Sequence, residues 1–105
     1  MARISNLPYV KGYQVVITTS GTPVQGTAYS VPDGVEVIVK AESTNTGTVT
    51  VAESSDNANT ASTDNYPLLP NEGVGIQVSN TDKIWFDSTV SGDKVRIFFE
   101  YEIIN

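Results

Sequence analysis

Apolar and polar residues alternate with a period of two along several stretches of the chain, most clearly over residues 35–41, 74–78 and 95–103. Because successive side chains of a β-strand point to opposite faces of a sheet, this alternation predicts strands with one buried face. No window carries apolar residues at the i, i+3, i+4 and i+7 positions of an amphipathic helix. The pattern therefore predicts an all-β fold without a helix longer than about two turns.

Turn-forming residues separate the predicted strands at intervals of about 8–12 residues. Proline presets the φ angle and glycine accepts positive φ, so Pro32-Asp33-Gly34 predicts a tight turn. A second turn at 45–47 would make residues 35–52 a hairpin. The series is typical of a single-domain β-sandwich or jelly roll with about seven to eight antiparallel strands. Its expected strand segments are 13–19, 24–31, 35–41, 48–51, 66–69, 74–78, 83–86 and 95–103.

Two segments do not fit the strand pattern. Residues 1–12 carry apolar residues but have no evident partner strand, so we expect an extended N-terminal arm beside a β-sandwich domain over residues 13–105. Alanine is the only apolar residue type in segment 54–65, which predicts a solvated loop that buries nothing. Because loop entropy changes slowly with length, we expect this loop to tolerate shortening.

Composition supports the strand prediction and narrows the function classes. The chain has 14 valines and 8 isoleucines against 3 leucines and 6 alanines, and β-branched residues favour strands. With 6 basic and 12 acidic residues and a formal net charge of −6, the chain cannot supply the large basic footprint that a nucleic-acid binder needs. No apolar run approaches a membrane span, and no signal-peptide core follows residues 1–6. We therefore expect a soluble product made in a cytoplasm.

The residues that usually carry catalysis or bind metals are scarce. The chain has no histidine and no cysteine, which removes imidazole bases, thiolate nucleophiles, disulfides and the commonest zinc ligands. Half of its 12 carboxylates fall in predicted turns and loops, where acidic residues are common for structural reasons. Segment 54–65 is rich in oxygen donors that suit calcium, but it lacks the D-x-[DN]-x-[DN]-G spacing of a calcium loop. We expect no enzyme activity and no catalytic, cofactor-binding or metal-binding residue.

Two large aromatic residues interrupt the polar side of predicted strands. Trp85 and Phe98 each stand between two apolar residues that strand alternation assigns to the core, so alternation turns both rings away from it. Either the rings are covered locally, or they are exposed and form a contact surface for a protein or a sugar.

The N-terminal arm adds apolar residues that a free chain end has little reason to display. We therefore expect the arm and the two aromatic residues to form a protein interface, by arm docking or by added-strand pairing with hydrophobic anchoring. The candidate interface residues are Ile4, Leu7, Tyr9, Val10, Trp85 and Phe98.

Five stretches, in order, resemble small β-sandwich virion proteins of tailed bacteriophages. They read VPDGVEVIVKA over residues 31–41, NTGTVTV over 45–51, LPNEGV over 69–74, DKIWF over 82–86 and GDKVRI over 92–97. The family pattern has Pro-Gly-Glu at the third stretch, where this chain has Pro70-Asn71-Glu72-Gly73. The resemblance implies a head decoration (cement) protein or a related head, neck or tail component, and it transfers no individual binding residue.

These observations give a set of functional expectations. We expect a non-enzymatic structural virion protein that binds and stabilises the phage head through protein–protein contacts. The expected partners are the major capsid protein or other virion subunits and further copies of the chain, in a homo-oligomer for which a trimer is one option. No nucleic-acid or membrane partner is expected. The expected location is the head surface of the virion, after synthesis in the cytoplasm of the host bacterium.

A second function class stays open. Many carbohydrate-binding modules are β-sandwiches with exposed aromatic residues, so the alternative is a carbohydrate-binding module on a phage fibre or a secreted enzyme.

Overall fold

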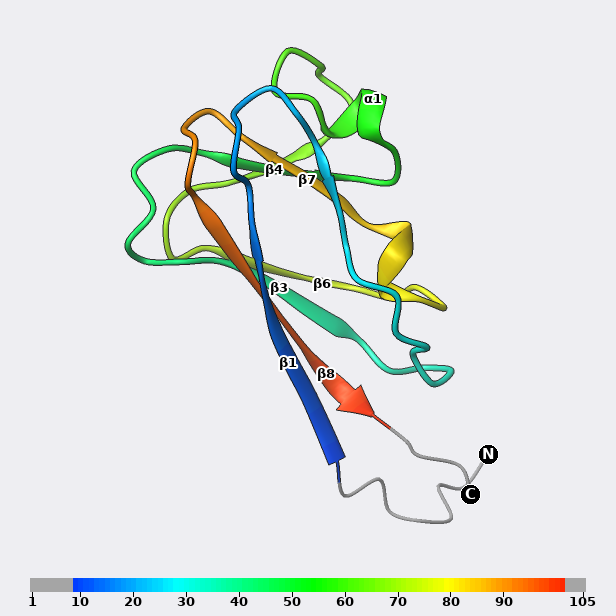
Figure 1. Ribbon diagram of the computed structural model, residues 1–105. Helices are drawn as coiled ribbons and strands as arrows, with labels where there is room; N and C mark the ends of the chain where they lie inside the picture. Colours follow the sequence, from blue (N-terminus) through cyan, green and yellow to red (C-terminus); the bar gives the residue numbers. More distant parts are fainter. Residues whose placement is uncertain (1–8, 102–105) are drawn as a thin grey trace.

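The computed structural model describes residues 9–101, which form two antiparallel four-stranded sheets packed face to face (Figure 1). The first sheet has the strand order β1 (Tyr9–Val16), β8 (Lys94–Tyr101), β3 (Val37–Ala41), β6 (Gly73–Ile76). The second sheet has the order β2 (Val24–Gln25), β7 (Trp85–Ser88), β4 (Val49–Ala52), β5 (Tyr66–Leu68). This architecture confirms the predicted all-β sandwich.

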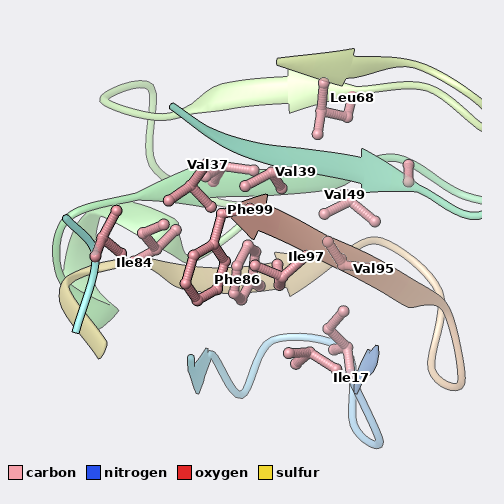
Figure 2. Packing of buried hydrophobic residues seen from close by; sticks show 14 of the residues in the cluster. Ile17, Val37, Val39, Val49, Leu68, Ile84, Phe86, Val95, Ile97 and Phe99 are labelled. Carbon is pink, nitrogen blue, oxygen red and sulfur yellow. The ribbon is translucent and has the colours of Figure 1, made fainter. Parts of the chain in front are cut away.

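The core lies between the two sheets and follows the predicted alternation. Every second residue is buried along β3 and along β8 as far as Glu100. Figure 2 shows the rings of Phe86 from β7 and Phe99 from β8 near the centre of the cluster, with branched aliphatic side chains around them. Both rings are almost completely buried. The period-two pattern thus identified the buried face of these strands correctly.

Two short helical segments occur within residues 9–101: α1 (Ser55–Ala58) and the 3-10 helix η1 (Thr81–Lys83). Neither exceeds two turns, as the sequence predicts. In the same part of the chain, no helix combines the length and the apolar character that crossing a lipid bilayer would require.

The predicted hairpin over residues 35–52 is wrong, because β3 and β4 belong to different sheets. The turn between them is bound to the start of β8. Asn45 donates from Nδ2 to the Lys94 carbonyl oxygen at 2.8 Å and accepts from the Lys94 N–H at 2.8 Å. The N–H groups of Thr46 and Gly47 donate to the Asp93 carboxylate. These bonds make the turn a corner between the sheets.

Two predicted strand boundaries also change. Residues 9–12, which we assigned to an arm without a partner strand, form the first half of β1 and pair with β8. The remainder of the predicted arm, residues 1–8, lies outside the described residues. The strand predicted over 24–31 shortens to β2, which ends at Gln25, next to the Gly26 that interrupts its pattern.

Segment 54–65 is folded, contrary to the prediction of a bare loop. Its helix α1 begins at Ser55, and the hydroxyl of the preceding Ser54 caps it by accepting from the Asn57 N–H. Ala58 is completely buried, and the hydroxyl of Thr50 donates to its carbonyl oxygen, which holds α1 against the outer face of the second sheet. Hydrogen bonds of polar side chains stabilise this segment, and the pattern of hydrophobic residues in the sequence cannot predict such bonds. Asn65 Nδ2 donates to three carbonyl oxygens, at 3.0–3.2 Å, those of Asn57, Asn59 and Ser62.

Candidate interaction site

The outer face of the first sheet carries four exposed apolar side chains. Val16 lies apart from the others, at the end of β1 opposite Lys94; the other three form what we call the outer patch: Val10, Ile38 and Phe98. They come from β1, β3 and β8, and strand alternation directs them away from the core. Val10 is 60% exposed, Phe98 50% and Ile38 39%. Exposed apolar side chains that cluster on one face usually mark a contact surface.

Strand register explains why these three side chains lie together. Phe98 stands opposite Gly12 of β1 on one side and opposite Ile38 of β3 on the other. Val10 pairs with Glu100, and this pair lies two positions along each strand from the pair of Gly12 and Phe98. Val10 is therefore a diagonal neighbour of Phe98 on the same face. Because Gly12 has no side chain, the Phe98 ring lies over its backbone, with Cδ1 3.2 Å from the place a Cβ would occupy. The missing side chain at Gly12 thus leaves room for the ring on this face of the sheet.

A polar network lies beside the outer patch, one row further along the same face. Arg96 Nε and Gln14 Nε2 both donate to Oε2 of Glu42, at 2.5 and 2.8 Å. The hydrogen bond from Gln14 and then that from Arg96 lower the pKa of the Glu42 carboxyl below its ordinary value. These charged and amide groups give the apolar patch a polar border, as interface rims commonly have.

The predicted interface residues fall in different parts of the molecule. Val10 and Phe98 come together in the outer patch, whereas Trp85 lies on the outer face of the second sheet, opposite Ala52 and Gln25, and is half-buried. Tyr9 begins β1 and pairs with Tyr101. Ile4 and Leu7 lie outside the described residues. Since Trp85 and Phe98 occupy outer faces of different sheets, they do not form one aromatic platform for a sugar.

Ile38 is the member of the outer patch that our sequence reasoning missed. It stands between Glu36 and Lys40 on the polar side of its strand, which is the same interruption that singled out Phe98. Pairing between β3 and β8 then places the two residues directly opposite each other. The signal was present in the sequence, but the strand pairing was needed to connect the two residues.

Two buried carboxylates, Asp87 and Asp93, have structural roles. Asp87 accepts from the backbone N–H groups of Gly21, Thr60 and Ser88 at 2.8–3.0 Å. Asp93 accepts from Thr46 N–H, Gly47 N–H and Ser88 Oγ at 2.7–3.2 Å. Both carboxylates are thus engaged in joining loops to strands. Within residues 9–101, no buried side-chain nitrogen or oxygen lacks a hydrogen-bond partner.

Metal-ligand groupings and similarity to other proteins add no further site. In the part of the chain that the structure describes, His, Cys, Asp and Glu residues form no group of three that could hold a metal ion. Comparisons of the chain with family models, with curated protein sequences and with solved structures gave no match.

Proposed function

We propose that the protein is a non-enzymatic structural component of a tailed-phage virion, a capsid decoration (cement) protein that binds the head surface through the outer patch. The observation that carries this proposal is the exposure of Val10, Ile38 and Phe98 on one sheet face, with a polar border beside them. The resemblance of residues 31–97 to small virion β-sandwiches supplies the class of partner, namely the major capsid protein or other virion subunits.

The strand pairing supports the jelly-roll form of the sandwich. β1 pairs with β8, β2 with β7, β3 with β6 and β4 with β5. Each pair is therefore nested inside the previous one along the sequence, which is the connectivity of a jelly roll. Jelly rolls occur in viral capsid proteins and also in lectins and cupins, so this support is an analogy at the level of the fold.

The size of the outer patch indicates how binding would work. Three side chains bury much less than the 1,200 Å² or so of a stable pairwise interface, so each single contact is weak. A homo-oligomer, such as a trimer, that bridges several capsid subunits would gain affinity because its later contacts form at high effective concentration. The acidic surface of the remaining molecule, with its net charge of −6, disfavours association with DNA.

Co-sedimentation with phage heads tests this proposal. Emptied heads of the phage that encodes the chain are incubated with wild-type protein, with Phe98→Ala or with Leu69→Ala as a control of similar exposure on another surface. We expect Phe98→Ala to weaken binding about thirtyfold, since truncation of an interface aromatic costs about 2 kcal/mol or more. The control should bind like wild type.

Two results contradict the proposal. One is equal head binding by the wild type and by Phe98→Ala, provided that the two proteins have the same near-ultraviolet circular dichroism spectrum and are therefore both folded. The other is an absence of head binding together with retention of the wild type on a glycan column, which indicates the carbohydrate-binding alternative.

A further inference from the structure

An apolar cleft of about 340 Å³ opens between the two sheets on the side where β5 and β6 are the edge strands. Val51 and Tyr66 line it from the second sheet, and Val74 and Ile76 line it from the first. These last two side chains are only half-buried, although they pack against the core. The cleft is therefore an opening at the side of the hydrophobic core, bordered by the backbone of two edge strands.

The hydrogen bonds of β3 show which backbone groups of its neighbours are engaged. The Glu42 N–H donates to the Lys94 carbonyl oxygen at 3.1 Å, toward β8, and the Ala41 N–H donates to the Glu72 carbonyl oxygen at 2.9 Å, toward β6. Alternate residues of a strand direct their backbone groups to opposite sides. The odd-numbered residues of β3 therefore bond to β6.

This pattern leaves β6 with free backbone groups at its outer edge. The residues opposite the odd-numbered positions of β3 are Val74 and Ile76, so these two use their N–H and C=O groups within the sheet. Gly73 and Gly75 direct their N–H and C=O groups away from β3, and both glycines are exposed. Across the cleft, β5 spans only Tyr66–Leu68 and contains Pro67, which has no N–H. The edge of β6 is a template for one more strand.

Charged side chains distinguish the two glycines. The Glu36 carboxylate lies over Gly75, in the space that a side chain there would occupy. The Lys40 side chain lies against Gly73, with Cβ 3.6 Å from the place of a Cβ. A strand added to β6 would therefore have an acidic neighbour opposite Gly75 and a basic neighbour opposite Gly73, both on the outer face.

We propose that the edge of β6 and the adjoining cleft bind an extended segment of a partner protein as an additional antiparallel strand. The segment alternates apolar and charged residues. Its apolar residues enter the cleft beside Val74 and Ile76, a basic residue lies opposite Gly75 near Glu36, and an acidic residue lies opposite Gly73 near Lys40. Backbone bonds to the glycines give affinity, while the cleft and the two charges give specificity. This site adjoins the outer patch, because Ile38 lies opposite Gly75 in the register of β3 and β6, but its argument does not depend on the proposed function.

A synthetic peptide with the blocked sequence Val-Arg-Val-Glu-Val tests the site. In antiparallel pairing its arginine meets Gly75 and its glutamate meets Gly73, and the three valines face the cleft. We titrate it into ¹⁵N-labelled protein and expect the amide resonances of the two glycines to shift, with a dissociation constant below about 1 mM. The charge-swapped peptide Val-Glu-Val-Arg-Val should bind about tenfold more weakly, because its charges then face like charges.

Two variants separate edge pairing from general adhesion. Gly75→Pro removes an N–H that points out of the sheet. Proline is tolerated at such edge positions, and the flexible Glu36 side chain must move aside to admit its ring. We expect this variant to abolish peptide binding. Val16→Pro is the matched control, because the register with β8 directs the Val16 N–H out of the opposite edge and its side chain is exposed. Glu36→Lys should reduce the preference for arginine opposite Gly75 and favour Val-Glu-Val-Glu-Val instead.

The proposal is overturned by any of three results: an absence of glycine amide shifts with the first peptide, equal binding of the two charge arrangements, or undiminished binding by a folded Gly75→Pro variant. It is also overturned if the wild type is a dimer that Gly75→Pro converts to a monomer, because a second copy would then occupy the edge.

Discussion

Asp93 illustrates what a single residue does beyond its place in the sequence pattern. Ser91-Gly92-Asp93 precedes the last strand, and such a tripeptide predicts a turn. In the fold its carboxylate is buried and accepts hydrogen bonds from residues up to 47 positions away. The turn was predictable because turn preference is local, whereas the partners are brought together only by the packing of the sheets. Because of these contacts, the turn between β3 and β4 leads from one sheet to the other and does not close the predicted hairpin.

Glu42 gives the protein an acid-sensitive contact. Its pKa is lowered by the hydrogen bond from Gln14 and then by that from Arg96, so the carboxylate stabilises the fold above the ordinary value of 4.5, and this contribution is lost as pH falls through the lowered folded-state pKa. We predict that urea midpoints of wild type and Glu42→Gln differ more at about pH 6 than at about pH 3. A constant difference between the two pH values would contradict this coupling.

At the scale of elements, the sequence predicted strand faces well and strand partners poorly. Period-two alternation depends on neighbouring residues, so the buried positions of β3 and β8 follow directly from it. Pairing depends on contacts between distant segments, so β3 and β4 looked like a hairpin although they lie in different sheets. The segment around α1 was missed for a different reason, because a buried alanine and a network of asparagine bonds have no hydrophobic signature. Likewise, Val10 and Phe98 were found individually, but Ile38 joined them only through register.

Asn65 is the residue on which the fold of segment 54–65 depends most. Its amide donates to three backbone carbonyl oxygens, and loss of bonds to buried or half-buried acceptors costs about 1–3 kcal/mol. We therefore predict that Asn65→Ala lowers the free energy of unfolding by about 1–2 kcal/mol, measured by urea denaturation. Exposed Thr63, in the same segment, provides the control: Thr63→Ala should change stability by less than about 0.5 kcal/mol. Equal effects of the two substitutions would restore the interpretation of the segment as a dispensable loop.

At the scale of the whole molecule, the pairing is dominated by strands that are distant in sequence. β1 and β8 pair along eight positions at opposite ends of the described chain, and β2 and β7 pair inside them. Loop closure must precede these contacts, which makes such topologies slow to form.

We predict refolding on the millisecond-to-second timescale, followed by stopped-flow fluorescence of Trp85, the single tryptophan. Refolding that is complete within microseconds would mean that local contacts, rather than the β1–β8 pairing, limit the rate.

The pairing of Tyr9 with Tyr101 determines how the molecule would respond to force. Antiparallel ladder bonds run perpendicular to the strands, so tension that draws these two residues apart acts along the bonds and loads one pair at a time. Strands β1 and β8, which lie side by side in Figure 1, would separate pair by pair from that end. Val10 would be among the first residues released. A molecule can therefore have a tightly packed core and still yield easily when it is pulled by the ends of its first and last strands. In an assembly under internal pressure, attachment across a sheet face would spread the load over several strands at once.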